Sequence, residues 1–367
     1  MGTAFRALLF ASMAALATSG SGREDRAFRP AEPIRAATEE PGGTLSVMTY
    51  NVKGLPWPVA QGREEALERI ASRLIALRRQ HRQPHIILLQ EAFTADAMAL
   101  ATRAGYRHSA LGPDAATRSA AAASAADLAY LRRARWDRGE QLGKSLGSGL
   151  MILSDYPITR ADRFAFPDFA CAGFDCLANK GVVIAHIDAP GGPIGVVNTH
   201  LNARTAAGVT IARSQQAYAR QTELMARFVT RKVRPHERLI LGGDMNIGRD
   251  PQRRQAFFAA FSGTRPSFVA PDMGGARQAI GRTASGEDRH DLARAVRHGK
   301  DWLFARDATG AAMQVVGAQV PFGKEAEGKP LSDHFGYVIQ YAAAARKPHE
   351  GIHFASQSAT PMGAERQ

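Results

Sequence analysis

The sequence predicts one α/β domain over residues 44–342. Short apolar runs of strand length recur along this region and are bounded by Pro or Gly turns. Two longer segments between these runs carry apolar residues at helical spacing. Strands that alternate with amphipathic helices are typical of layered α/β proteins, in which the helices cover the faces of a sheet.

The first half of the region begins with a predicted strand, LSVMTYNV, at residues 45–52. One face of residues 64–77 is apolar, which predicts an amphipathic helix. Pro84 ends the helical pattern, and HIILLQEAF at residues 85–93 is predicted as a buried strand. Residues 112–147 are rich in Ala, Arg and Ser, and the sequence does not predict their order.

Six further apolar runs predict the remaining strands: GLMILS, GVVIAHI, IGVVNTHL, RLILGGDMNI, KDWLFA and FGYVIQY. Between the third and the fourth of these, residues 211–229 are predicted as a long helix. Residues 248–298 are mixed and favour no particular element. Repeats at solenoid periods are absent, so a single folding unit is the simplest interpretation.

Composition places the chain among globular proteins with anionic partners. Apolar residues make up 45% of the 367 residues, which excludes the disordered and fibrous classes. The net charge is +13 and the pI is near 10.2. This balance favours nucleic acid, phosphorylated small molecules or an anionic membrane surface as partners, and it does not choose among them.

The two ends of the chain differ from its centre. Residues 1–17 hold one Arg, an apolar run and a small-x-small sequence, so they are predicted to be a secretory signal peptide, too short for a membrane span. Residues 18–43 are predicted to be a flexible leader, and residues 343–367 a disordered tail. We therefore expect a secreted or periplasmic protein.

The two cysteines, Cys171 and Cys176, lie close together in CAGFDC. In an exported chain such a pair predicts a disulfide that closes a small loop. Two unlinked thiols are the alternative. A zinc site is not expected, because no further Cys or closely spaced His joins the pair.

Polar groups with catalytic chemistry stand at the ends of six predicted strands. They are Asn51, Glu91, Asn198, His200, Asn202, Asp244, Asn246, Asp301, Asp333 and His334. A single polar strand end is ordinary solvation, but six of them predict a site, because loops from several strands converge at the strand ends of α/β sheets.

The residue types in this set suit the hydrolysis of a phosphate ester. Glu91 with Asn51 offers hard oxygen ligands for Mg²⁺. One histidine can take a proton from water while another donates to the developing charge. A histidine base is normally oriented by a carboxylate, for which Asp301 and Asp333 are both candidates.

Seven segments carry, in order, a resemblance to a known family: MTYNV, LLQEAF, SGLMILSDYPI, NTHLNA, LGGDMNI, KDWLFA and LSDHFGY. They resemble the signature segments of the endonuclease/exonuclease/phosphatase superfamily, the metal-dependent phosphodiesterases related to DNase I, over residues 45–341. CAGFDCLANKGVVIAHI and THLNA are further similar to segments of secreted neutral sphingomyelinases of the phospholipase C type. The resemblance implies a four-layer α/β sandwich of two mixed β-sheets flanked by helices.

The resemblance also implies a role for each matching residue. Glu91 would be the main ligand of Mg²⁺, or of another divalent cation such as Mn²⁺, with Asn51 beside it and Asp333 in or near the metal shell. His334 would be the general base and Asp301 its orienting carboxylate, although the resemblance leaves open whether Asp244 takes the proton instead. The other implied roles are transition-state stabilisation or leaving-group protonation by His200, positioning of water and phosphate by Asp244 and Asn246, and substrate contact by Asn198 and Lys180.

Three function classes follow for the chain. The leading hypothesis is a secreted, monomeric phosphodiesterase that hydrolyses a phospholipid head group, with peripheral contact to a membrane surface. The alternatives are a secreted DNase-like nuclease and a catalytically dead binding protein, and the intact set of site residues argues against the latter. Asn202 replaces the Gln of the sphingomyelinase pattern, the loop after Asn51 is shorter, and the segment before His334 offers only Phe322 in place of an aromatic hairpin. These departures bear on the lipid substrate more than on the chemistry.

Overall fold

The fold is described from a computed structural model, which covers residues 43–56, 59–263, 269–325 and 330–343. The predicted signal peptide at residues 1–17, almost all of the predicted leader and the tail lie outside these described residues. None of the helices in the described part is both long and apolar enough to cross a membrane.

The first sheet has six strands in the order β10-β11-β1-β2-β4-β3. β1 and β2 are parallel and the other pairs are antiparallel, so the sheet is mixed. The strands are β1 (Thr44–Gly54), β2 (Ile86–Ala92), β3 (His108–Leu111), β4 (Met151–Ser154), β10 (Val315–Phe322) and β11 (Gly336–Ala342).

The second sheet has five strands in the order β5-β6-β7-β8-β9, in which only β7 and β8 are parallel. The strands are β5 (Ile158–Ala165), β6 (Gly181–Ala189), β7 (Gly192–His200), β8 (Arg238–Asp244) and β9 (Asp301–Arg306). The central strands are continuous apolar runs in the sequence, because both faces of each sheet are covered and side chains on both sides of the strand are buried.

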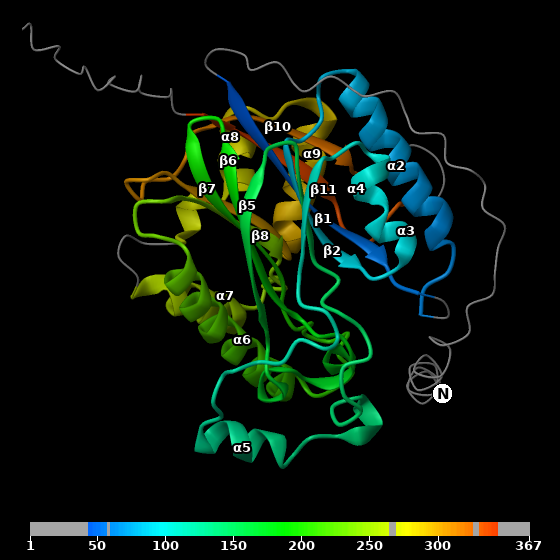
Figure 1. The fold of residues 1–367 in the computed structure, drawn as a ribbon, viewed down its shortest axis with the longest axis vertical. Coiled ribbons are helices and arrows are strands. Elements are labelled where there is room, and N and C mark those ends of the chain that lie inside the picture. Colours follow the sequence, from blue (N-terminus) through cyan, green and yellow to red (C-terminus); the bar gives the residue numbers. More distant parts are fainter. Residues whose placement is uncertain (1–42, 57–58, 264–268, 326–329, 344–367) are drawn as a thin grey trace, which may run out of the picture.

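Helices cover the outer face of each sheet (Figure 1). The six-stranded sheet carries α2 (Arg63–Arg79), α3 (Ala95–Met98) and α4 (Leu100–Arg103), and the five-stranded sheet carries α6 (Ile211–Lys232) and α7 (Pro251–Ser262). The remaining α-helices in the described chain are α5 (Ala125–Leu131), α8 (Gly275–Arg282) and α9 (Gly286–His298).

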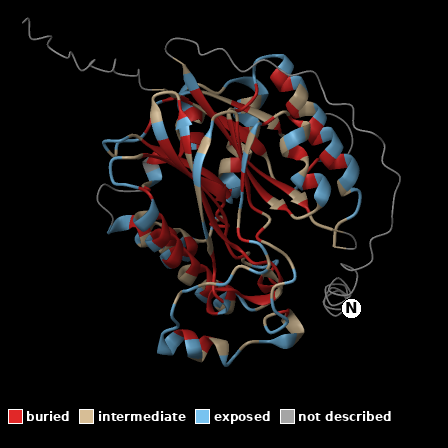
Figure 2. Ribbon diagram, viewed as in Figure 1, coloured by how far each residue is buried: buried red, intermediate tan, exposed pale blue. Residues whose placement is uncertain are grey.

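Three large apolar clusters hold these layers together, and buried residues run along the strands (Figure 2). The central cluster joins the facing sides of the two sheets, with Leu88 and Ile152 from one and Val196 and Ile240 from the other. The outer clusters join each sheet to its helices. The order helix, sheet, sheet, helix confirms the predicted four-layer sandwich of two mixed sheets.

A glycine pair in β8 allows close packing, at Gly242 against the facing sheet and at Gly243 against the neighbouring strand β7. A Cβ on Gly242 would lie 2.9 Å from Leu88 Cδ2 of the facing sheet, and one on Gly243 would lie 2.1 Å from Thr199 O. Gly243 also has a φ of 128°, a backbone conformation that other residues rarely adopt. Gly242 therefore permits the close approach of the two sheets, and Gly243 the close approach of β7, just before Asp244 at the end of β8.

The predicted strands and the two predicted helices are present, with ends shifted by a few residues. The sequence did not reveal β3, β5, β10 or the helices α3, α4, α5, α7, α8 and α9. β5 and β10 are edge strands with half-exposed, interrupted apolar patterns, and β3 has only four residues. Their periodicity is correspondingly weak.

Candidate active site

The carboxyl ends of β1, β2, β7 and β8 meet at one end of the sandwich. A hydrogen bond of 3.2 Å from Asn51 Nδ2 to Asp244 Oδ2 joins the first sheet to the second there. Asp301 begins β9 beside Asp244, its partner in the antiparallel pairing of β8 and β9. His334 comes from the loop before β11. The structure thus gathers residues that lie far apart in the sequence.

His334 and Asp301 form a close pair across the two sheets. The Nδ1 atom of His334 lies 2.8 Å from Asp301 Oδ2 and 3.0 Å from Oδ1. Ser332 Oγ accepts a hydrogen bond from the His334 backbone N and donates one of 2.7 Å to Asn51 O. Of the two carboxylates that the sequence offered as partners of His334, the structure places Asp301 against it, and both the ring and its backbone are held.

The Oδ2 atom of Asp244 lies near the imidazole rings of both His200 and His334. His200 Nε2 lies 3.4 Å from this oxygen and His334 Nε2 lies 3.7 Å from it. The side chain of Asp244 is almost completely buried. Two imidazole Nε2 atoms therefore lie near one carboxylate oxygen, that of His200 from the end of β7 and that of His334 from the loop before β11.

The carboxylates control the protonation of His334. Burial opposes its charged form, but Asp301 and Asp244 outweigh this and raise the pKa of His334 to about 10. Burial favours the neutral form of Asp244, yet the positive charge of His334 and His200 lowers its pKa to about 2. In the metal-free protein at neutral pH, His334 is thus the cation of this group, and Asp244 is a weak base.

His200 behaves in the opposite way. Burial, followed by the nearby ammonium of Lys180, lowers the pKa of His200 to about 4. Its ring is therefore neutral at pH 7 and can donate a hydrogen bond from Nε2. Within the described residues, Nδ1 of His200 is buried and has no hydrogen-bond partner.

Glu91 and Asn51 provide a place suited to a divalent cation. Burial raises the pKa of Glu91, and the hydrogen bond that it receives is a neutral one of 2.9 Å from Asn51 Nδ2. That amide nitrogen stands between the carboxylates of Glu91 and Asp244, at a point that positive charge would favour. A reversed amide would turn its oxygen to the same point. The donor set of carboxylate and amide oxygens matches the preference of Mg²⁺.

A second grouping has ligand-like geometry. Among the residues that the structure describes, one set of three acidic or histidine side chains has its ligand atoms within 4.8 Å of one another: Asp244, Asp301 and His334. Here the His334 ring is already occupied by Asp301 through Nδ1. The pair of Glu91 and Asn51, next to Asp244, is therefore the better place for a cation.

The backbone at the site is held in unfavourable conformations. Among non-glycine residues in the described chain, positive φ occurs at Lys53, Glu91, Asn246 and one residue elsewhere, His81. Such conformations cost about 1–3 kcal/mol each and persist where the surroundings impose them. Three of the four lie at the strand ends of the candidate site, on or next to its predicted residues.

Two predicted residues, Asp333 and Asn198, lie differently from the prediction. Asp333, expected in the metal shell, has a 59% exposed side chain that pairs with Lys53 at 3.5 Å, so its position does not support direct ligation. Asn198, expected to contact substrate, is fully buried and bonds to Leu89 O, Met151 O and Gln90. It joins the two sheets beneath the site and has no surface for a substrate. Asn202 is likewise buried and accepts a hydrogen bond from Ala172 N.

Lys180 and Asn246 support the segment after β7. Lys180 Nζ donates 3.2 Å to Leu201 O and pairs with Asp175 at 2.9 Å. Asn246 Nδ2 donates to the same Leu201 O at 2.9 Å. Both side chains therefore fix the backbone next to His200, and Lys180 also adds positive charge to the site.

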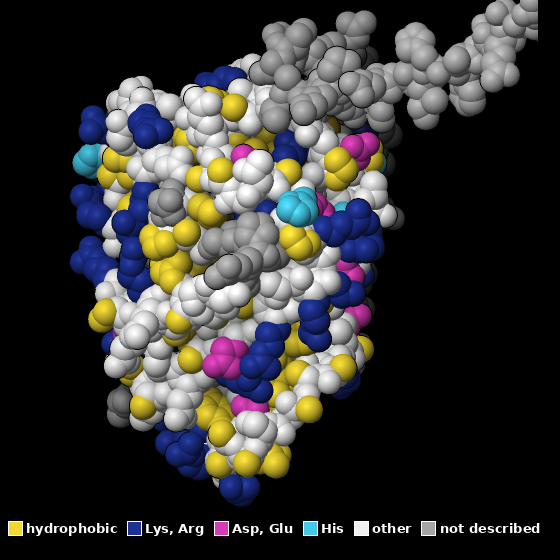
Figure 3. Space-filling model, turned by 90° about the vertical axis from the view of Figure 1, so that its left-hand side faces the viewer, with side chains coloured by type: hydrophobic (Ala, Val, Ile, Leu, Met, Phe, Trp, Pro, Cys, Tyr) yellow, Lys and Arg dark blue, Asp and Glu magenta, His cyan; other side chains and the backbone are white. Residues whose placement is uncertain are grey.

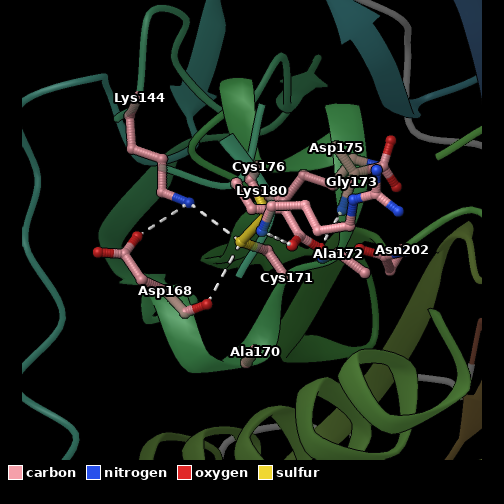
Figure 4. The surroundings of a disulfide bond; sticks show 12 residues. Lys144, Asp168, Ala170, Cys171, Ala172, Gly173, Asp175, Cys176, Lys180 and Asn202 are labelled. Atoms are coloured by element: carbon pink, nitrogen blue, oxygen red, sulfur yellow. Dashed lines mark hydrogen bonds and ion pairs between the residues drawn. A yellow bond between two sulfur atoms is a disulfide. The ribbon is translucent and has the colours of Figure 1, made fainter. Parts of the chain in front are cut away.

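The predicted disulfide between Cys171 and Cys176 is present (Figure 4). The loop that it closes is tied to the site, because Asp175 binds both Lys180 and the backbone N of Ala203. On the other side of the loop, Lys144 Nζ lies 3.2 Å from Asp168. The disulfide loop thus connects residues 112–149 with the strand that carries His200.

Sequence reasoning missed three supporting residues. Ser332 links Asn51 to His334, and Gln90 donates to Asn198 Oδ1 between the sheets. Arg253 is fully buried on α7 and donates to Asn202 O and Asn246 O at 2.7 and 2.9 Å. A signal for Arg253 was present, since Asp250-Pro251 is a typical helix start, with Asp250 Oδ1 capping the helix.

Comparison with known proteins places this geometry in a family. Over 311 residues the chain is 24% identical to a sphingomyelinase of Mycobacterium tuberculosis, covering 83% of this chain and 54% of the relative. It is 22% identical to sphingomyelinase C of Leptospira interrogans, covering 61% of this chain and 38% of that protein. The chain spans about half the length, or less, of the curated relatives it matches.

Solved structures share the fold. Sphingomyelinase C from Streptomyces griseocarneus superposes with a TM-score of 0.54 at 18% identity, covering 82% of this chain and 99% of that one. A beta toxin from Staphylococcus aureus with bound magnesium ions gives 0.54 at 16% identity, covering 82% and 100%. D. rerio TDP2 complexed with a single-stranded DNA product gives 0.52 at 15% identity, covering 81% and 98%.

The family assignment rests on the match to a family model. The model of the Endonuclease/Exonuclease/phosphatase family matches residues 48–334, a span that runs from β1 to the histidine of the His334–Asp301 pair. The chain belongs to the endonuclease/exonuclease/phosphatase family.

Proposed function

We propose that this protein is an exported, monomeric phosphodiesterase that depends on a divalent cation and hydrolyses the head group of a phospholipid, as a sphingomyelinase does. The observation that carries the proposal is the His334–Asp301 pair, which faces Asp244 across the site from Glu91 and Asn51. Together these groups can move a proton, hold a phosphate and favour a cation at one point.

The chain's own residues divide the work of hydrolysis. Asp301 fixes His334 through Nδ1 and leaves Nε2 to accept a proton from the attacking water. Asp244, with the backbone N of Asn246 bonded to its Oδ1 at 3.0 Å, orients the groups around the phosphate. Neutral His200 donates from Nε2 toward the charge that develops on phosphate oxygen.

Glu91 and Asn51 would hold the cation. A divalent cation held there would supply polarisation of the phosphate oxygens and would offset part of the carboxylate charge that keeps His334 protonated, which would favour its action as a base. The positive φ at Glu91 fixes the direction of its carboxylate toward Asn51.

A phospholipid substrate is supported by the relatives that the chain matches, which carry the name sphingomyelinase. Phe322, the aromatic residue offered by the segment before His334, is buried and stacks on Tyr50 with ring centroids 4.8 Å apart. Phe322 therefore packs in the protein and cannot enter a bilayer in this conformation. Any contact with a membrane has to come from another part of the surface.

Export is supported by the disulfide. Disulfides persist in oxidising compartments and are rare in the cytosol, and the Cys171–Cys176 bond stands next to the site residues that it supports. The predicted signal peptide at residues 1–17 would direct the chain there. Fractionation of cells that express the full chain, with detection of a shortened N-terminus outside the cytoplasm, tests this part of the proposal.

The activity is tested with purified protein and Mg²⁺ on sphingomyelin vesicles and, separately, on plasmid DNA. We expect release of phosphocholine, loss of the activity on chelation, and recovery on re-addition of Mg²⁺ or Mn²⁺. Glu91→Gln should raise the Mg²⁺ concentration needed for half-maximal rate, while Glu287→Gln on the exposed surface of α9 should not. Cleavage of DNA with no release from any phospholipid would overturn the proposed substrate.

A DNase-like nuclease is the second candidate, and two observations favour it. The net charge of +13 suits a polyanion. The fold is also shared with D. rerio TDP2, whose structure holds a single-stranded DNA product. The plasmid arm of the same assay decides between the two substrates.

A further inference from the structure

The segment between β3 and β4, residues 112–149, forms a lobe with an unusual surface. Its exposed apolar side chains are Trp136, Leu142 and Leu128, which are 70%, 55% and 48% exposed. Most exposed apolar residues of a soluble protein are scattered singly, whereas a tryptophan so far in solvent, in the same segment as two exposed leucines, indicates an interaction surface. Trp136 is also the one aromatic residue among the exposed large apolar residues of the described chain.

The lobe leaves the molecule at the end that carries the site. β2 and β3 both pair antiparallel with β4, so their carboxyl ends lie at the same end of the sheet. The lobe returns at Gly149, whose O accepts a hydrogen bond of 2.9 Å from Ala92 N, next to Glu91. Figure 1 shows α5, within the lobe, at the extremity of the molecule below the two sheets.

Buried contacts hold the lobe in a fixed conformation. Glu140 pairs with Arg213 of α6 at 2.6 Å, and the guanidinium of Arg213 lies 4.0 Å from the ring centre of Tyr130. Tyr130 donates a hydrogen bond of 2.7 Å to Cys171 O in the disulfide loop. The apolar side chains at its surface are therefore presented by an anchored segment.

The anchors also leave the surface of the lobe positive. The carboxylates of Glu140 and Asp127 are directed inward, to Arg213 at 2.6 Å and to Arg220 at 2.8 Å. Arg132 and Arg133, between α5 and Trp136, are exposed. Basic side chains lie beside hydrophobic ones at the lower end of the space-filling view, where the lobe lies (Figure 3).

We propose that this lobe docks the protein on an anionic lipid bilayer, with Trp136 and Leu142 entering the headgroup region and Arg132 and Arg133 facing acidic headgroups. Tryptophan favours the membrane–water interface, and clustered basic residues are attracted to anionic leaflets. The inference deepens the proposed function, because a phospholipid hydrolase has to reach its substrate at a surface. Docking itself does not require hydrolysis.

The surface suits lipid better than a nucleic acid strand. Single-stranded nucleic acid is bound by successive aromatic platforms along a basic groove, and the lobe presents one aromatic side chain with two leucines. Leucine has no stacking surface for a base, but it gains free energy on entering an apolar layer.

The test measures co-sedimentation of the full chain with vesicles in the presence of a chelator, so that no lipid is hydrolysed. The vesicles are phosphatidylcholine alone or phosphatidylcholine with phosphatidylglycerol. We expect binding to the anionic vesicles, weakened about tenfold by Trp136→Ala and about fivefold per residue in Arg132→Gln/Arg133→Gln. The matched control is Arg227→Gln/Arg231→Gln, on the exposed C-terminal part of α6 near the start of β8 and away from the site.

Trp136 fluorescence provides a second measurement, which is made on the unaltered protein and so does not depend on the folding of a variant. Brominated lipid should quench part of the emission of the unaltered protein, and Trp136→Phe should lose that quenched part. Equal binding by the unaltered protein and both lobe variants, or no quenching on bound vesicles, would overturn the proposal. The proposal would also be overturned if the unaltered protein bound single-stranded DNA but not vesicles, and if the Arg132→Gln/Arg133→Gln variant lost that DNA binding. Vesicle binding without phospholipid hydrolysis would retain the docking surface and reject only the proposed activity.

Discussion

The two sheets contribute unlike halves of the site. The six-stranded sheet supplies Asn51 and Glu91, oxygen donors at strand ends, and the loop that carries His334. The five-stranded sheet supplies His200 and Asp244, and it supplies Asp301, the carboxylate against His334. Neither sheet alone holds both His334 and its orienting carboxylate Asp301, or both the Glu91–Asn51 pair and Asp244, to which the amide of Asn51 bonds. The site is therefore a property of the docked pair, and sheet docking and catalysis should be lost together.

The largest effect is expected from His334, where the two halves meet. His334→Ala removes the proposed base and should lower the rate of hydrolysis by about 10³-fold. His290→Ala, at an exposed position on α9, should leave the rate unchanged. Steady-state rates on the substrate that proves active are the measurement, and a variant with full activity would refute the assignment.

Asp301→Asn tests the contact across the sheets without removing a ring. It keeps the shape of the side chain but removes the negative charge that, with Asp244, holds the pKa of His334 high. We expect a loss of rate of about 10²-fold. The NMR titration of the His334 ring in the metal-free protein should also move to lower pH, because less negative charge favours the neutral imidazole. An unchanged titration would show that Asp301 supports the fold and does not tune the base, and Asp188→Asn, on the exposed surface, is the control.

Asn198→Leu tests the polar connection between the sheets. It would leave Leu89 O, Met151 O and the amide of Gln90 without their partner in a buried place. We expect a loss of about 3 kcal/mol in the free energy of unfolding, measured by urea denaturation. Gln255→Leu on the exposed side of α7 should change it little. A variant that keeps its stability but loses activity would return Asn198 to the substrate-contacting role that its burial argues against.

The smallest effect concerns contacts within the six-stranded sheet, at the end away from the site. His85 Nδ1 accepts a hydrogen bond of 3.1 Å from Ser46 N, and burial lowers the pKa of His85. The unfolded chain takes up a proton near pH 6.5 and the folded chain only at lower pH, so stability should fall as the pH falls below about 6.5. His85→Asn retains an acceptor and should lose this part of the pH dependence in thermal unfolding measured from pH 7 to pH 5. An identical pH profile for both proteins would contradict the prediction.

The sequence predicted the parts of the fold that show a strong local pattern. Buried strands such as β2 and β8 read as continuous apolar runs. Edge strands such as β5, in which exposed residues do not alternate regularly with buried ones, gave too weak a period to be recognised.

The site shows a similar division. The side chains that carry the chemistry stand at strand ends, where their types are visible in the sequence. Ser332 and Arg253 act through backbone carbonyls of distant segments, Asn51 O in one case and Asn202 O and Asn246 O in the other. A hydrogen bond to the backbone of a distant segment cannot be predicted from a single sequence, because every residue carries the same backbone carbonyl. Asp333 is a contrasting case, because its neighbour His334 suggested a shared role, whereas its side chain is 59% exposed and pairs with Lys53.

The positive φ angles at Lys53, Glu91 and Asn246 have a consequence for how the protein can change. Glycine at any of these positions would relieve an unfavourable backbone conformation, by about 1 kcal/mol where the side chain contributes little else. A laboratory selection for thermal stability alone should therefore accumulate glycine at these strand ends, while a selection that includes turnover should not. The conflict between the two selections would locate the functional positions without any knowledge of the substrate.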